Sequence, residues 1–189
     1  MAEANRERVL RAATDSFLQH GYQASVVEIA RRADVAKQTV YHHFPSKDRL
    51  FAEVARELAM SVLVELEGGD VRAALMRFAL AYRERALGAQ GIATFRTLVP
   101  EVSRFRATAR SMYADTVGAM VERLAEYLGA AMREGRLRRD DPVLAAEMLL
   151  SMLAGIDRVK RLFCVTNGIK NDERRAANIV DTFLQAYKT

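Results

Sequence analysis

Five side chains suited to holding a DNA duplex occur within one short segment of the 189-residue chain. All five take outward positions on a helix predicted over residues 37–44, and they are Lys37, Gln38, Thr39, Tyr41 and His42. Val40 and Phe44 stand four residues apart and would bury the opposite face. A Gln amide can bond a base edge twice, and hydroxyl, aromatic and cationic groups suit thymine methyls and phosphate oxygens. The segment therefore predicts a DNA-reading helix.

The same residues suit catalysis and metal binding poorly. His42 and His43 are adjacent on an exposed helix, and the sequence offers them neither a paired acid nor a nucleophile in a strained turn. With His20 and the single Cys164, they lack the ligand spacing of a zinc site. We therefore expect no enzymatic activity, no metal and no cofactor. The alternative to a DNA contact is that His42 is a solvated surface residue.

The preceding residues predict the elements that would position this helix. Val27, Ala30 and Ala33 give a helix an apolar stripe, and residues 33–36 form a corner that Val35 can plug. An amphipathic helix over 3–20 precedes this pair and ends at Gly21, since glycine is favoured just beyond a helix C-terminus. After Pro45, Ser46 is the predicted N-cap of a long helix over 46–67.

Together these features resemble the DNA-binding domain of the TetR (tetracycline-repressor-like) family of bacterial transcription regulators. The resemblance covers about the first 50 residues. Its elements are Gly21-Tyr22, the Val-x-x-Ile-Ala core from Val26, the Thr-x-Tyr-x-His-Phe pattern from Thr39, and Ser46-Lys47. The resemblance implies a double-stranded operator as partner, with phosphate contacts from Ser25 and Lys47 beside the five recognition-helix residues.

Three residues depart from the family pattern. Val26 stands where a second hydroxyl commonly reaches phosphate. Asp34 stands where the family usually has a turn glycine, which adopts left-handed geometry more easily. Ala36 replaces the usual Ser or Thr cap, which removes a side-chain acceptor at the start of the recognition helix.

Composition favours a helical globular protein. Hydrophobic residues make up 50% of the chain, charged residues 28%, and the mean hydropathy is −0.10. The net charge is +5, but residues 1–50 carry eight basic against six acidic side chains, so the motif and not bulk charge indicates DNA. A lone Cys164 forbids an intrachain disulfide, and no apolar run approaches 18 residues. We expect a cytoplasmic protein that does not associate with membranes.

Helical periodicity continues along the rest of the chain, with no strand alternation. Further helices are predicted over residues 71–87, 92–98, 101–134, 142–165 and 173–187. The expected fold is all-α with about nine helices. Residues 1–46 would form a three-helix helix-turn-helix domain, and residues 47–189 a helical ligand-binding and dimerisation domain.

The last two predicted helices have apolar faces too wide for a single internal contact. The family resemblance implies a four-helix dimer interface made by these helices from two subunits, and a two-fold operator needs two reading heads. The residues predicted at this interface are Leu149, Leu153, Ile156, Ile179, Val180 and Phe183. The alternative for each is ordinary intrachain core.

A second group of apolar residues could line a ligand cavity. Its members are methionine and aromatic residues of the middle helices, namely Tyr82, Phe95, Phe105, Met112, Tyr113, Met120 and Met152. The alternative is again core packing.

We therefore expect a homodimeric repressor that leaves a pseudo-palindromic operator when a small, largely apolar effector binds. One alternative is an activator of the same fold, because operator position decides that outcome. The other is a helical carrier or enzyme whose helix-turn-helix no longer reads DNA.

Overall fold

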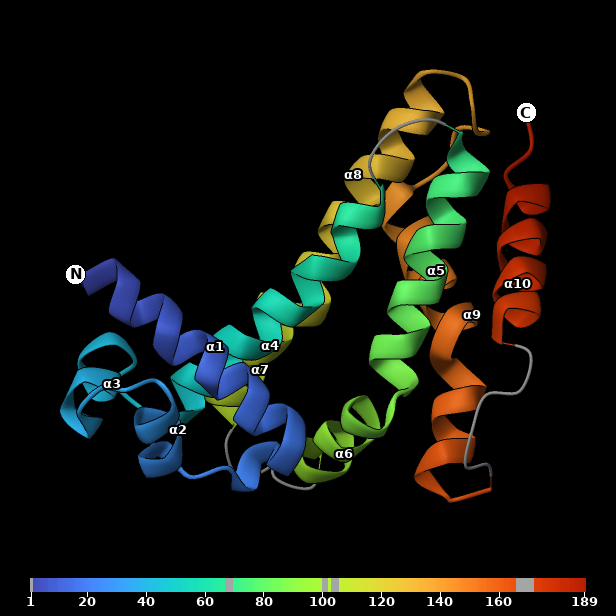
Figure 1. Ribbon diagram of the computed structural model, residues 1–189. Coiled ribbons are helices and arrows are strands. Elements are labelled where there is room, and N and C mark those ends of the chain that lie inside the picture. Colours follow the sequence, from blue (N-terminus) through green and yellow to red (C-terminus); the bar gives the residue numbers. More distant parts are fainter. Residues whose placement is uncertain (1, 67–69, 100–101, 103–105, 166–171) are drawn as a thin grey trace. The chain divides into compact units, whose positions relative to one another are not determined.

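The structure is a computed structural model and describes residues 2–66, 70–99, 102, 106–165 and 172–189 (Figure 1). Every regular element in these ranges is helical, which confirms the all-α fold class. Packing divides the chain into two compact units. Unit 1 contains residues 1–58 and 93–116, and unit 2 contains residues 59–92 and 117–189. The division after residue 46 into a DNA-binding domain and a ligand-binding and dimerisation domain stays a prediction.

The described helices follow the predicted order closely. In chain order they are α1 (Ala2–His20), α2 (Val26–Arg32), α3 (Lys37–His43), α4 (Lys47–Ser61), α5 (Val71–Leu87), α6 (Ala89–Leu98), α7 (Arg106–Tyr113), α8 (Ala119–Arg133), α9 (Pro142–Leu162) and α10 (Asp172–Ala186). Two predictions need correction. The helix expected to reach residue 67 leaves α geometry at Ser61 and continues as a 3-10 helix over Val62–Leu66. The helix expected over 101–134 contains a π-helical turn, Ala114–Gly118, between α7 and α8.

Polar side chains fix several helix starts. Ser46 accepts a hydrogen bond from the Arg49 amide at 3.1 Å, as an N-cap for α4. Asp70 does the same for α5 through Ala73 N at 2.9 Å. The Asp141 carboxylate accepts from two amides of the first turn of α9, where Pro142 stands at the start of the helix.

Unit 1 has its own apolar core, built by α1, α2, α3 and the first part of α4. Ile29, Val40 and Leu50 are at most 1% exposed in it. One member of the predicted stripe on α2 was wrong, because Val27 is 60% exposed and Val26 is buried instead. Ala30 and Ala33 are buried as predicted. Val35 packs against this core, as the corner prediction requires.

The core of unit 2 is formed by α5, α8, α9, α10 and the 3-10 segment Val62–Leu66. Leu75, Leu124 and Leu153 are fully buried in it. In Figure 1, α10 runs beside α5 and α9, in agreement with the contacts between these helices.

A fully buried arginine links three helices of unit 2. Arg83 of α5 donates to Asp172 of α10 at 2.7 Å and to Asp157 of α9 at 3.0 Å. It also donates to the Leu153 carbonyl. Arg175 contacts the same Asp157 carboxylate at 2.7 Å. A buried guanidinium is tolerated only where such partners replace its lost hydration.

Candidate nucleic-acid interface

The corner before the recognition helix is a helix end closed by backbone hydrogen bonds. Asp34 has φ +51°, the left-handed geometry that favours glycine. Its amide donates to Arg31 O at 3.2 Å, and the Val35 amide donates to Ala30 O at 3.1 Å. These two bonds form a Schellman motif, with aspartate at the position usually taken by glycine.

Arg8 of α1 stabilises this unusual corner. Its Nε and Nη2 donate to the Ala33 carbonyl at 3.0 and 2.6 Å, and Nη2 lies 3.2 Å from Asp34 Oδ2. The guanidinium thus contacts both the backbone and the side chain of the corner. The angle between α2 and α3 is therefore held by α1 as well as by the core.

The recognition helix α3 presents the predicted polar face. Val40 is 1% and Phe44 5% exposed, which places the buried side as expected. The five predicted residues lie on the other side, where Thr39 is half-buried and the other four, Lys37, Gln38, Tyr41 and His42, are exposed. His43 is half-buried beside Phe44. The Ala36 cap makes no side-chain hydrogen bond, so no capping side chain covers the amides of the first turn of α3.

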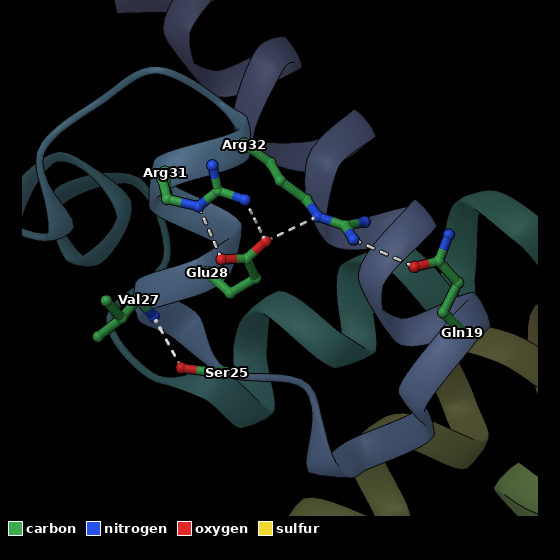
Figure 2. A network of polar contacts seen from close by, with 6 residues as sticks. All are labelled: Gln19, Ser25, Val27, Glu28, Arg31 and Arg32. Carbon is green, nitrogen blue, oxygen red and sulfur yellow. Dashed lines mark hydrogen bonds and ion pairs between the residues drawn. The ribbon is translucent and has the colours of Figure 1, made fainter.

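Ser25 combines a local structural contact with exposure. Its Oγ accepts a hydrogen bond from the Val27 amide at 3.3 Å and caps α2 (Figure 2). The hydroxyl proton is not used in that bond and can be donated to an anion. This arrangement is compatible with the predicted phosphate contact.

Sequence reasoning missed an ion-pair network on the exposed side of α2. Figure 2 shows the Glu28 carboxylate between Arg31 and Arg32, while Arg32 reaches Gln19 of α1. Arg31 contacts Glu28 through two bonds of 2.8 Å, and Arg32 through one of 3.1 Å. The hydrogen bonds from Arg31 and then Arg32 lower the pKa of Glu28 to about 2. The spacing of these residues at three and four positions could have indicated the network.

Lys47 lies at the start of α4 over an aromatic ring. Its Nζ is 4.6 Å from the centroid of the Tyr22 ring. The Tyr22 hydroxyl donates to Asp48 Oδ1. Burial, followed by the hydrogen bond to Asp48, raises the pKa of Tyr22 to about 12, and burial lowers the pKa of Lys47. Neither Tyr22 nor Asp48 was among the predicted site residues.

The predicted dimer residues divide into two groups. Leu149, Leu153, Val180 and Phe183 are at most 1% exposed in the core of the single chain. Their own chain covers these side chains, and their place at a dimer interface stays a prediction. Ile156 is 58% exposed, and Ile179 is partly buried against the core.

The exposed apolar residues of α9 follow a different stripe. Besides Val143, six of them recur at intervals of three or four and are Leu144, Met148, Met152, Ile156, Val159 and Phe163, the last at the C-cap. We call these six residues the α9 face. Each is between 38% and 78% exposed in the single chain.

The predicted ligand residues are spread over both units. Phe95, Met112 and Tyr113 belong to unit 1, where Met112 packs against the core and Tyr113 is 58% exposed. Phe105 lies outside the described residues. In unit 2, Met120 is buried and Tyr82 stacks on Phe78, with ring centroids 5.8 Å apart. Met152 belongs to the α9 face, so the seven residues do not form one cluster within a unit.

The described parts of the chain lack two further classes of site. No group of three His, Cys, Asp or Glu residues is placed there to hold a metal ion. No helix in the same ranges is long and apolar enough to span a membrane.

Comparison with known proteins gives matches at both ends of the chain. Residues 9–54 match the model of bacterial regulatory proteins of the tetR family, and residues 73–189 match the C-terminal domain of AefR-like transcriptional repressors. An uncharacterised HTH-type transcriptional regulator of Mycobacterium tuberculosis is 32% identical over 145 residues, 76% of this chain and 75% of the relative.

Solved structures agree over nearly the whole length. A structure described as a TetR-family regulator from Mesorhizobium loti has 26% identity and a TM-score of 0.81, covering 100% of this chain and 99% of that one. The flavonoid-responsive regulator FrrA has 30% identity and a TM-score of 0.68, with 96% of each chain covered. The helix order described above is thus shared from end to end.

Proposed function

The chain belongs to the TetR family of bacterial regulatory proteins, and on this premise we propose that it is an effector-controlled repressor of a pseudo-palindromic operator. Members of this family bind DNA and typically act as dimers. The chain is accordingly a DNA-binding transcription regulator and not an enzyme. The match of residues 73–189 to AefR-like repressors supports repression over activation. We place the activity in the cytoplasm, where bacterial DNA lies.

The exposed face of α3 carries the proposal for DNA reading. Lys37, Gln38, Tyr41 and His42 project from one short helix whose other side is anchored by Val40 and Phe44. Such a helix can enter the major groove while its neighbours contact the backbone. Thr39, Ser25 and Lys47 complete the proposed DNA contacts.

Base and phosphate contacts are expected to respond differently to mutation. Gln38→Ala should relax sequence preference at one position of each half-site, because an amide that bonds a base edge is lost. Lys47→Ala should weaken binding to every duplex and lower the salt slope by about one unit, because one phosphate contact is lost. Titrations of selected and scrambled duplexes at several salt concentrations measure both effects.

DNA reading is tested by selecting bound duplexes from a random pool, with wild type and Gln38→Ala in parallel. A two-fold symmetric consensus for wild type, and one degenerate position per half-site for the variant, are expected. A wild-type protein that enriches no sequence would favour the carrier alternative. Identical consensus sequences would remove Gln38 from the reading residues. An operator upstream of the promoter whose occupancy raises transcription would favour the activator.

We place the dimer interface on the α9 face. The six side chains form an exposed apolar stripe along most of a 21-residue helix, which is unusual for a surface that stays in water. Gly155 lies beside Ile156, and a Cβ added there would meet no atom within 4 Å. A mid-helix glycine costs about 1 kcal/mol relative to alanine. Close approach by a helix of the second copy would account for a glycine at this position.

We assign effector binding to unit 2. The proposal rests on the family and on FrrA, which is described as flavonoid-responsive and shares 30% identity over 96% of this chain. Tyr82 and Met120 are the predicted ligand residues that pack in the core of this unit, and they favour an apolar or aromatic molecule. An effector acts only through its differential affinity for the operator-bound and released states. Coupling of about 1–3 kcal/mol gives roughly 5- to 150-fold release.

A thermal-shift screen of lipophilic compounds, flavonoids included, tests this assignment. Compounds that stabilise wild type should stabilise Tyr82→Leu less, and they should weaken operator binding. Tyr113→Leu is the matched control, because Tyr113 is exposed and lies outside unit 2. Equal stabilisation of all three proteins would place the ligand elsewhere. Hits that leave operator affinity unchanged would speak against effector control.

A further inference from the structure

The contact between Lys47 and Tyr22 joins the start of α4 to the turn that follows α1. The ammonium group lies over the face of the ring, 4.6 Å from its centroid. Lys47 is half-buried and forms no ion pair within the described residues. The ring is the group in direct contact with this cation, and the neighbouring Asp48 carboxylate also attracts its charge.

Tyr22 is itself fixed from two directions. Its ring meets Phe51 of α4 edge to face at 5.3 Å, and Phe51 meets Phe17 of α1 in the same way at 4.9 Å. The hydroxyl is bound to Asp48, the residue next to Lys47. The ring thus has little freedom to turn away from the lysine.

A ring platform suits a phosphate contact better than a carboxylate partner would. The attraction between an ammonium and an aromatic face uses the positive charge and none of the three N–H donors as a directed hydrogen bond. A carboxylate would neutralise the charge and compete with phosphate for the donors. The platform also restricts a flexible four-carbon side chain, whose ordering otherwise opposes binding.

We propose that Tyr22 is a positioning residue that holds the Lys47 ammonium ready for a phosphate oxygen of the DNA backbone. This inference rests on the proposed DNA-binding function and on the phosphate role of Lys47. Asp48 supports the arrangement by fixing the tyrosine hydroxyl, and Phe51 supports it by fixing the ring.

A double-mutant cycle tests the coupling. Wild type, Tyr22→Leu, Lys47→Ala and the double variant are titrated with a 30-base-pair duplex at several salt concentrations. Tyr22→Leu should weaken binding about two- to fivefold, as expected for loss of a cation–π contact. It should also reduce the salt slope toward that of Lys47→Ala. In the Lys47→Ala background the same tyrosine change should have no further effect.

Phe17→Leu is the matched control. It removes an aromatic partner of the same Phe51 ring, but it leaves Lys47 and Tyr22 in contact. It should lower thermal stability without changing the salt slope. A tyrosine effect that is equally large with and without Lys47 would reduce Tyr22 to a packing residue and overturn the proposal.

Nuclear magnetic resonance of the wild-type protein gives a second measurement that needs no variant to fold. The ring current should shift the Lys47 ε-methylene protons upfield of those of an unstructured lysine. Tyr22→Phe, which keeps the ring and loses only the hydrogen bond to Asp48, should preserve most of the shift. An unshifted Lys47 signal would overturn the platform. Failure of Lys47→Ala to alter DNA binding would instead count against the proposed phosphate contact.

Discussion

Arg83→Met is expected to lower the free energy of unfolding by about 3–5 kcal/mol, the cost of removing one partner from a buried ion pair. Arg83 is fully buried, and its partners Asp157 and Asp172 are only 15% and 26% exposed. Without the guanidinium, Asp172 would lose this ion-pair partner in a poorly hydrated space, and Asp157 would keep Arg175. Methionine fills much of the volume, so most of the loss should be electrostatic. Urea denaturation at neutral pH measures the difference.

Arg72→Met is the matched control for this change. Arg72 also joins α5 to α10, through Asp181 at 2.6 Å, but both side chains are about half exposed. Water replaces a surface partner readily, so its removal should leave the unfolding midpoint nearly unchanged. If the two variants lost equal stability, burial would not be the cause. A midpoint for Arg83→Met close to wild type would show that the three-helix link is unimportant.

Ile156→Arg is expected to convert the proposed dimer to a folded monomer. An interface on the α9 face would bring like charges from two copies together, at a cost of about 3 kcal/mol or more. That corresponds to roughly a 100-fold rise in the dimer dissociation constant. Operator affinity should fall by a similar factor or more, because two linked heads bind far more tightly than one. Sedimentation and operator titration measure the two effects.

Two other arginine substitutions separate this explanation from general damage. Val117→Arg also places a charge at an apolar position that is 48% exposed, on a residue outside α9, and this variant should remain dimeric. Leu153→Arg places the charge in the core of unit 2 and should unfold the chain. A dimer of unchanged mass for Ile156→Arg would place the interface on another surface.

The contrast between buried Leu153 and exposed Ile156 shows that sequence periodicity alone does not determine which apolar side of a helix packs in its own chain. α9 is apolar on two sides, so its spacing indicates that both sides are covered but not which one faces its own chain. The same ambiguity affected α2, where Val26 and Val27 are adjacent and the helix has only two turns. α3 could be predicted correctly because Val40 and Phe44 leave a single apolar side.

The contacts that complete the site depend on residues far apart in the chain. The approach of Tyr22 to Lys47, or of Arg8 to the α2–α3 corner, follows from how the helices cross, and no local pattern encodes a crossing angle. Methionine and aromatic spacing cannot show which residues share a ligand cavity, for a related reason, so the ligand set stays a prediction. Met112 and Met120 are eight residues apart but pack in the cores of different units.

The corner at Asp34 has a consequence for how this chain can vary during evolution. Glycine would take the left-handed geometry with less strain, by about 1 kcal/mol, so aspartate alone is a poorer choice. Arg8, 26 positions earlier, supplies contacts to the Ala33 carbonyl and the aspartate carboxylate that offset this strain. The residues at positions 8 and 34 are therefore expected to change together. A lineage that loses the arginine gains by restoring glycine, and one that keeps the arginine can retain the aspartate.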